Sequence, residues 1–243
     1  MTMAHSTLKL SALAAFTGLM VSGPALATGD GERGGAGCDA IAGQLGNSVY
    51  TGLERALKAV APNQQANGGS GGHIWGAIVD PNGVVCALAF TGPDLRDQRL
   101  VARVASAQKA NTAVLFNLPA GVGGRVDAFS SANLYAPTQP GGSLFGLQFS
   151  NPVDPAVAYG DNRPGGDETS QGADTNEVPP PYGTREEPLV GEYIGGISVF
   201  GGGLALYDAN GNVVGGLGVS GDTSCADHNI AWWARNRRWA WTS

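Results

Sequence analysis

The sequence predicts an α+β fold, with an antiparallel sheet of about four to five strands and helices packed on it. Two pairs of β-rich segments are each joined by a tight turn, which is the usual connection between antiparallel neighbours. Helical patterns lie before and after these pairs, whereas a parallel fold would alternate single strands with helices. The chain has 243 residues, 42% of them hydrophobic, which is enough apolar material for the core of one domain.

Apolar residues at spacings of three and four mark the helices, and turn residues separate the strands. Pro81-Asn82-Gly83 and Asn210-Gly211 are favourable hairpin turns, and Pro62 ends the first helix. A long stretch rich in Pro, Gly, Asp and Asn has neither pattern and is predicted to be an irregular loop. The predicted elements are a helix over 38–61, strands 73–80 and 84–91, a helix over 97–116, a loop over about 151–190, strands 196–208 and 213–220, and a helix over 226–239.

Residues 1–27 have the pattern of a secretory signal peptide and are set apart from the fold. The apolar run 10–21 is roughly 12 residues long, short of the ~20 that a membrane span needs. It is followed at 25–27 by a small-x-small cleavage site. We expect residues 28–37 to be a disordered, glycine-rich leader and residues 38–243 to be a single domain. The protein should therefore be secreted or periplasmic, without stable membrane insertion.

The composition argues against nucleic acid as a partner, and the glycine content bears on how the chain packs. The chain has 14 Lys and Arg against 20 Asp and Glu, and this acidic balance does not suit a nucleic-acid backbone. Glycine is abundant, at 39 residues, which indicates tight turns and close backbone approaches. The glycine-rich run 215–221 lacks the G-K-[ST] of a phosphate loop. We interpret it as backbone packed closely on a neighbouring element, or as a rim that a flat ligand approaches.

The three cysteines, Cys38, Cys86 and Cys225, predict one disulfide in an exported protein, with one cysteine left over. The sequence does not choose the pair. Cys225 lies three residues before His228, so a reactive thiol with a histidine base is one interpretation of this segment. We favour the other interpretation, in which Cys225 belongs to the disulfide.

Outside the predicted signal peptide the chain has two histidines, His73 and His228, and either is a candidate iron ligand because neutral imidazole commonly binds metals. His228 is the stronger candidate, since helical spacing places it on one stripe with Trp232 and Arg235. Aromatic surface beside a guanidinium suits a porphyrin plane and its propionates. The alternative is that this helix faces a partner protein.

Lys109 and Thr112 lie near one face of the helix predicted over 97–116. A lysine at the edge of an apolar face usually extends its charged end into solvent. The functional alternative is contact with an anion, such as a carboxylate of a bound cofactor.

Several segments of the chain resemble the GlcG/HbpS family of haem-binding and haem-degrading proteins. The K-A-x-T-A-x-x-F motif begins at Lys109, and V-G-G-L-G-V-S-G ends at Gly221; the turn 80–83 and Gly201-Gly-Gly-Leu204 also match, and the resemblance spans most of 38–235. It implies an antiparallel sheet flanked by helices, a homo-oligomer, and binding of haem or, in related modules, a corrinoid.

The resemblance also bears on the site residues. Lys109 and Thr112 match the family's motif. Some relatives are expected to use a histidine in the first helix, where this chain has Tyr50 as the nearest substitute by type. No single axial ligand is shared across the family, so the resemblance selects none.

The resulting hypothesis is an exported, oligomeric protein that binds haem or a related tetrapyrrole for sequestration, transport or redox sensing. His228 or His73 would ligate the iron, aromatic side chains such as Trp232 would cover the ring, and Lys109 or Arg235 would contact the propionates. Two alternatives are an enzyme for a small metabolite with a reactive Cys225, and a module that binds another protein.

Overall fold

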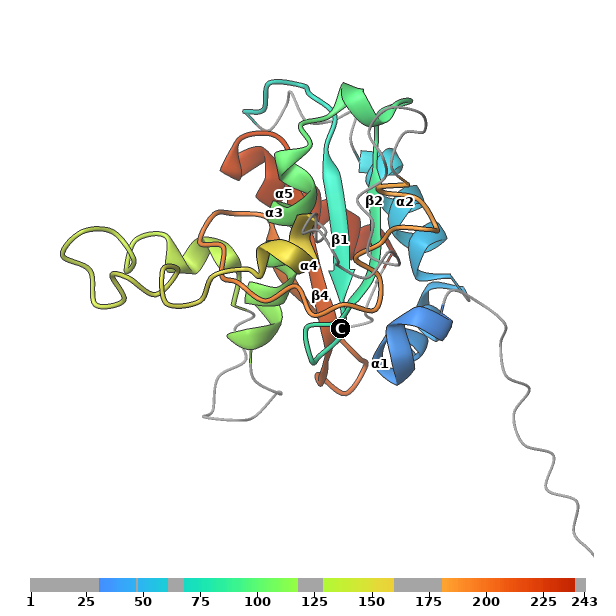
Figure 1. Cartoon of the computed structure of the whole chain (residues 1–243), viewed down its shortest axis with the longest axis horizontal. Coiled ribbons are helices and arrows are strands. Elements are labelled where there is room, and N and C mark those ends of the chain that lie inside the picture. The colour runs from blue at the N-terminus through green and yellow to red at the C-terminus, as the bar shows by residue number, and fades with distance from the viewer. Residues whose placement is uncertain (1–30, 47, 61–67, 118–128, 160–180, 239–243) are drawn as a thin grey trace, which may run out of the picture.

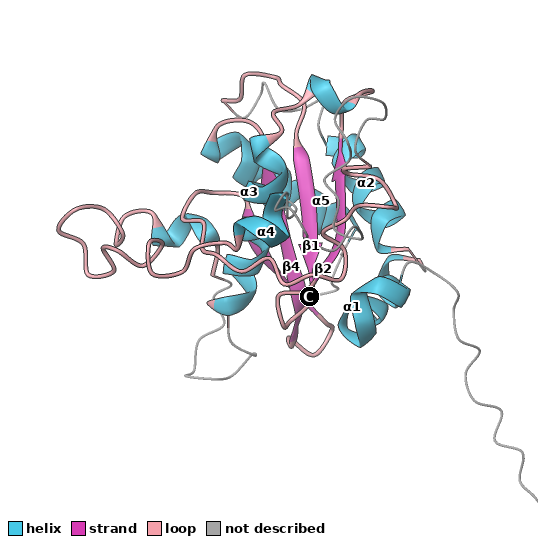
Figure 2. Ribbon diagram, viewed as in Figure 1, coloured by secondary structure: helices cyan, strands magenta, loops and turns pink. Residues whose placement is uncertain are grey.

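The computed structural model describes residues 31–46, 48–60, 68–117, 129–159 and 181–238. Its centre is a four-stranded antiparallel sheet in the order β2-β1-β4-β3 (Figure 2). Each predicted hairpin forms as expected, and pairing of β1 with β4 joins the two hairpins into one sheet. The predicted α+β class is therefore confirmed. The strands are β1 (Trp75–Val79), β2 (Val85–Phe90), β3 (Gly203–Tyr207) and β4 (Val213–Ser220).

Both hairpin turns are held by an aspartate at their first position. Asp80 Oδ1 accepts hydrogen bonds from the backbone N–H groups of Asn82 and Val84 at 2.8 and 2.9 Å. Asp208 Oδ1 does the same for Asn210 and Asn212, both at 2.8 Å. An Asx side chain that bonds the backbone two residues ahead replaces a missing backbone partner. The turn glycines named in the sequence, Gly83 and Gly211, have φ of 89° and 80°, whereas the aspartate bonds were not predicted.

Helices cover both faces of the sheet (Figure 1). One helix, α3, packs on β4, β1 and β3, and the opposite face carries α2, α5 and α1. Side chains alternate between the faces, since Ile78 joins the α2 cluster while Ala77 and Val79 join the α3 cluster. The helices are α1 (Gly31–Leu45), α2 (Val49–Val60), α3 (Val101–Leu115), α4 (Pro155–Tyr159) and α5 (Ser224–Arg238).

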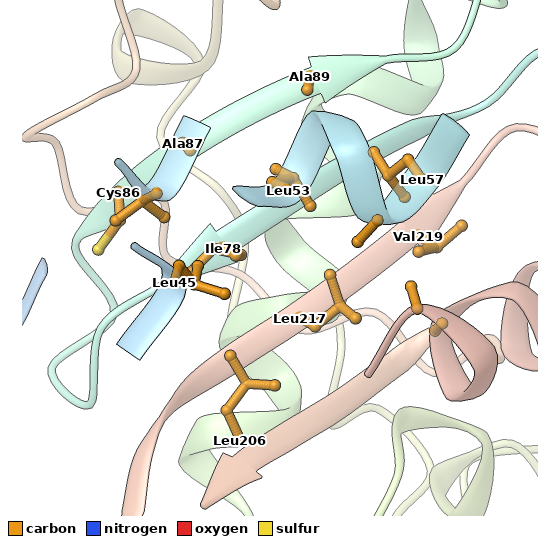
Figure 3. Close-up of a cluster of buried hydrophobic side chains, with 14 of the residues drawn as sticks. Leu45, Leu53, Leu57, Ile78, Cys86, Ala87, Ala89, Leu206, Leu217 and Val219 are labelled. Carbon is orange, nitrogen blue, oxygen red and sulfur yellow. The ribbon is translucent and has the colours of Figure 1, made fainter. Parts of the chain in front are cut away.

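The core on the α2 side is built from the residues that the helical period selects. Figure 3 shows Leu53 and Leu57 of α2 above Ile78 and Leu217 of the sheet. Gly76 of β1 has no side chain, and Leu57 fills the space above it. A β-carbon built on Gly76 would lie 2.6 Å from Leu57 Cδ1. The residues on the predicted apolar face of this helix are therefore buried, which confirms the amphipathic pattern.

The first helix of the prediction is two helices in the structure. The chain turns at Gly46, where φ is 89°, and Ser48 Oγ accepts the N–H of Thr51 to start α2. Apolar spacing continues across this break, so the period alone does not reveal it. Part of the expected leader is also helical, because α1 begins at Gly31, with a non-helical residue at Gly35.

The disulfide joins Cys38 of α1 to Cys86 of β2, and Cys225 is a free, exposed thiol. The expectation that Cys225 belongs to the disulfide is therefore wrong. The pairing depends on α1 lying against β2, which is a contact between segments far apart in the sequence.

The segment between α3 and β3 departs from the sheet. Residues 131–150, here called the arm, start with a 3₁₀ turn (Ser131–Leu134) and extend away from the body of the domain, in yellow-green in Figure 1. The chain then forms α4 and returns beside β2, where Gly191 N–H donates to Val85 O at 2.9 Å. The loop predicted over about 151–190 falls partly outside the described residues.

The helix α3 packs closely on the sheet because glycines lie beneath it. A β-carbon on Gly218 would be 1.9 Å from Ser106 O, and one on Gly216 would be 2.3 Å from Ala110 O. Main-chain oxygens cannot rotate away as side chains do. The glycine-rich run of β4 thus provides close backbone packing, as one of its two interpretations proposed.

We predict that Gly218→Ala destabilises the protein by about 1–3 kcal/mol, because the added methyl forces α3 off the sheet. Urea denaturation measures the change in the free energy of unfolding. Gly43→Ala is the matched control: that glycine is exposed in α1 with nothing within 4 Å of the added carbon. Better helix propensity should make this control neutral or more stable by up to ~1 kcal/mol. Equal stability of Gly218→Ala and wild type would contradict the prediction.

Candidate functional site

Lys109 lies in the interior rather than at a solvated helix edge. It is 3% exposed, and its Nζ donates to Asp227 Oδ2 at 2.8 Å and to Val219 O at 3.0 Å. Burial lowers the pKa of Lys109 from 10.5, and the carboxylate of Asp227 opposes that shift. A ligand carboxylate would have to displace Asp227 to reach this ammonium.

Thr112 is also fully buried. Its hydroxyl donates to Gln108 O at 2.8 Å and accepts the N–H of Ser198 at 2.9 Å. These bonds tie Ser198, in the segment that leads into β3, to α3. Thr112 therefore has a structural role in this fold, and its hydroxyl is already engaged.

The Lys109–Asp227 pair holds the beginning of α5. Asp227 Oδ1 accepts the N–H of Asp222 at 2.9 Å. The Asp222 carboxylate in turn accepts the N–H groups of Ser70 and Gly71, at 2.8 and 3.1 Å. The first turn of α5 is thereby connected to α3, to β4 and to the segment before β1.

His228 follows directly after Asp227 on this fixed turn. Its ring is half-buried, and Nδ1 is buried with no hydrogen-bond partner among the described residues. Burial lowers the pKa of His228 from 6.5, and the nearby charge of Arg235 lowers it further. The imidazole is therefore neutral at neutral pH, which is the form that binds a metal.

Trp232 and Arg235 lie on the same side of α5 as His228, at spacings of four and seven. The Trp232 ring is 43% exposed and meets Trp233 edge to face, with ring centroids 5.3 Å apart. Arg235 is half-buried and its Nη1 donates to Ala205 O of β3 at 3.3 Å. The structure thus brings His228, Trp232 and Arg235 together above the β3 edge of the sheet.

The remaining candidates lie on other elements. His73 is exposed before β1, with Nδ1 3.4 Å from Thr91 Oγ1. Tyr50 is half-buried on α2 under the guanidinium of Arg185, which is 5.3 Å from the ring centroid. Burial raises the pKa of Tyr50 above 10.0. We call His228, Trp232 and Arg235 the α5 group. Neither His73 nor Tyr50 shares a described contact with it.

Cys225 stands in the first turn of α5, exposed and unpaired with another cysteine. His228 Nδ1 makes no hydrogen bond within the described part of the chain, so this nitrogen does not activate the thiol. In those same residues, no group of three or more His, Cys, Asp and Glu side chains could hold a metal ion. What this part of the chain offers a metal is the one half-buried imidazole of His228.

Two half-exposed aromatic residues near the start of β3 were not recognised in the sequence. Phe200 directly precedes Gly201, and Tyr135 of the arm lies with its ring centroid 6.1 Å from that of Phe200. Isolated aromatic residues in irregular segments carry no period that would reveal their burial or their neighbours. Their exposure beside a glycine-rich segment is visible only in the folded chain.

The arrangement defines a class of protein: an α+β domain with a candidate binding surface formed by α5 and the edge strand β3. The model of the family described as haem-degrading, HbpS-like proteins matches residues 53–235, and the chain belongs to this family. The resemblance seen in the sequence is thereby confirmed. A search of curated proteins finds no match.

Several solved structures are distantly similar. The PduOC–haem complex is 25% identical, with a TM-score of 0.43, over 75% of this chain and 86% of that one. Protein ORFY of Klebsiella pneumoniae is 19% identical, with a TM-score of 0.44, over 77% and 88%. HbpS is 16% identical, with a TM-score of 0.41, over 77% and 85%. The family assignment rests on the family model.

We predict that Lys109→Met lowers the free energy of unfolding by ~3–5 kcal/mol, because it leaves the buried Asp227 carboxylate without its partner. Urea denaturation measures the loss. Lys58→Met is the matched control, since it removes an exposed pair with Glu54 and should cost about 0.3–0.5 kcal/mol. A loss as small in Lys109→Met as in the control would contradict a buried charge pair.

Proposed function

We propose that this protein is an exported haem-binding protein and that His228 is the axial ligand of the haem iron. The observation that carries the proposal is the half-buried His228 imidazole, whose Nδ1 has no hydrogen-bond partner in the described part of the chain and whose helical turn is anchored by Asp227. Burial and Arg235 also lower the pKa of His228. The family to which the chain belongs is described as haem-degrading, which supports haem as the ligand class. Sequestration, transport or redox sensing are the roles we infer for it.

The residues around His228 suit such a ligand. Haem, when bound, would supply an iron centre and redox chemistry of its own. The neutral imidazole would bind the iron, and the exposed Trp232 ring would cover part of the macrocycle. Arg235 uses Nη1 on Ala205 O, and a guanidinium has further donors for a propionate. Lys109 is assigned no propionate, because Asp227 holds its ammonium.

Export is the second part of the proposal. Residues 1–27, which carry the signal-peptide pattern, lie outside the described residues. The disulfide between Cys38 and Cys86 supports an oxidising compartment, where such bonds persist. Within the described part of the chain, no helix is both long and apolar enough for a membrane span.

We also propose a homo-oligomer. The arm exposes the large apolar side chains of Leu144, Phe145 and Phe149. Exposed apolar groups gathered on one segment are typical of surfaces that bind another protein. A second copy of this chain is the partner we infer.

Hemin titration tests the proposed ligand. Wild-type protein should shift the Soret band of hemin, and His228→Ala should lose that spectrum and at least about tenfold in affinity. His73→Ala is the control and should bind as wild type does. Cobalamin titrated in parallel distinguishes a corrinoid ligand. An unchanged spectrum in His228→Ala would exclude this residue as the ligand, and no Soret shift in wild type would exclude haem.

The pH dependence of the same titration has a defined sign. The folded pKa of His228 lies below 6.5, so affinity should hold on acidification to pH 6.5 and fall only as the pH passes through that lower pKa. Arg235→Gln removes a neighbouring positive charge and should raise the pKa of His228. The midpoint of the loss should therefore move to higher pH in this variant, whatever its affinity at neutral pH.

Native mass spectrometry of protein from an exported preparation tests export and assembly together. We expect a chain that begins at Thr28 and a native mass that is a multiple of the chain mass. Phe145→Ser with Phe149→Ser should shift the native mass toward the single chain. A retained N-terminus would contradict export, and a native mass equal to one chain in wild type would contradict the oligomer.

A further inference from the structure

Tyr135 and Phe200 form an exposed aromatic pair where the base of the arm meets the segment before β3. Their side chains are 50% and 51% exposed, and neither residue belongs to a described hydrophobic cluster. The ring planes are tilted by 41° with centroids 6.1 Å apart. Two large rings that contact each other but leave half their surface in solvent provide apolar area that a ligand can cover.

The backbone beneath both rings is held in place. Ser131 Oγ donates to Phe200 O and accepts the N–H of Gly203 at 2.8 Å, which ties the base of the arm to the start of β3. Tyr135 O accepts hydrogen bonds from Thr138 Oγ1 and Gln139 Nε2 at 3.0 and 2.9 Å. A preformed surface binds a rigid ligand with less loss of conformational entropy than a mobile one.

The backbone that carries Phe200 lies next to the turn that carries His228 because Gly201 lets α5 approach. A β-carbon on Gly201 would be 2.5 Å from Ser224 O and 3.1 Å from His228 Cβ. Phe200 is the preceding residue, so the chain carrying its ring is in contact with the turn carrying the imidazole. Phe200 and the imidazole are therefore carried by adjoining stretches of backbone at the β3 edge.

We propose that Tyr135 and Phe200 form an aromatic wall for the macrocycle of a tetrapyrrole, so that the ring is held by the arm and the β3 edge as well as by α5. This inference rests on the proposed function and adds two binding residues to it. Neither residue would contact the iron. Their contribution should therefore be the same for a porphyrin with or without a metal, whereas that of His228 should require the metal.

This difference gives a test with two probes, hemin and iron-free protoporphyrin IX. Tyr135→Ala and Phe200→Ala should each weaken binding of both probes about 2–12-fold, and the double variant should weaken it further. His228→Ala should weaken binding of hemin alone. Fluorescence of protoporphyrin IX and absorption of hemin report the affinities, and both are read on the full mature chain.

Two control variants separate stacking from other roles. Tyr135→Phe keeps the ring and removes the hydroxyl, so it should bind both probes as wild type does. Tyr193→Ala removes an exposed aromatic ring outside the arm, which is 65% exposed, and should also leave both affinities unchanged. Circular dichroism and urea denaturation verify that each variant folds.

The outcomes distinguish this inference from the proposed function. If Phe200→Ala and Tyr135→Ala bind protoporphyrin IX as Tyr193→Ala does, while hemin still depends on His228, the wall is excluded and the proposed function stands. If wild type binds neither probe, both are excluded. If the double variant changes the native mass but not porphyrin affinity, the pair belongs to an interface between copies and the wall is again excluded.

Discussion

The buried ion pair between Lys109 and Asp227 is the interaction on which the candidate site depends. Lys109 comes from α3 on one face of the sheet, and Asp227 from α5 on the other. The lysine side chain passes Gly202, where a β-carbon would be 3.2 Å from Lys109 Cδ and 3.3 Å from Asp227 Cβ. A buried charge is costly when unpaired, so this bond fixes the two helices relative to each other. The position of His228, one residue later, follows from it.

A second buried pair organises the other side of α3. Arg103 donates to both carboxylate oxygens of Glu187 and to Ala158 O, and its guanidinium lies 3.9 Å from the centroid of the Tyr182 ring. This network anchors α4 and the returning segment to the same helix. Because α3 is covered on all sides, its polar side chains have to find partners within the protein. That is why Lys109 and Thr112 are structural rather than solvated residues.

The candidate site is assembled from three separate parts of the chain. α5 contributes His228, Trp232 and Arg235, while the segment before β3 contributes Phe200 and the arm contributes Tyr135. Glycines make this meeting possible, since Gly201 and Gly202 admit α5 and Lys109 where larger residues would collide.

The sequence by itself determined the antiparallel sheet, both hairpin turns, the family, and the stripe of His228, Trp232 and Arg235 on one helix. These features depend on backbone preferences and side-chain periods that act within a few residues. Only the tertiary structure decided that Cys38 pairs with Cys86, that Lys109 is buried against Asp227, and that Tyr135 meets Phe200. Such contacts join residues far apart along the chain, and they form because packing of whole elements places them together, which no local pattern encodes.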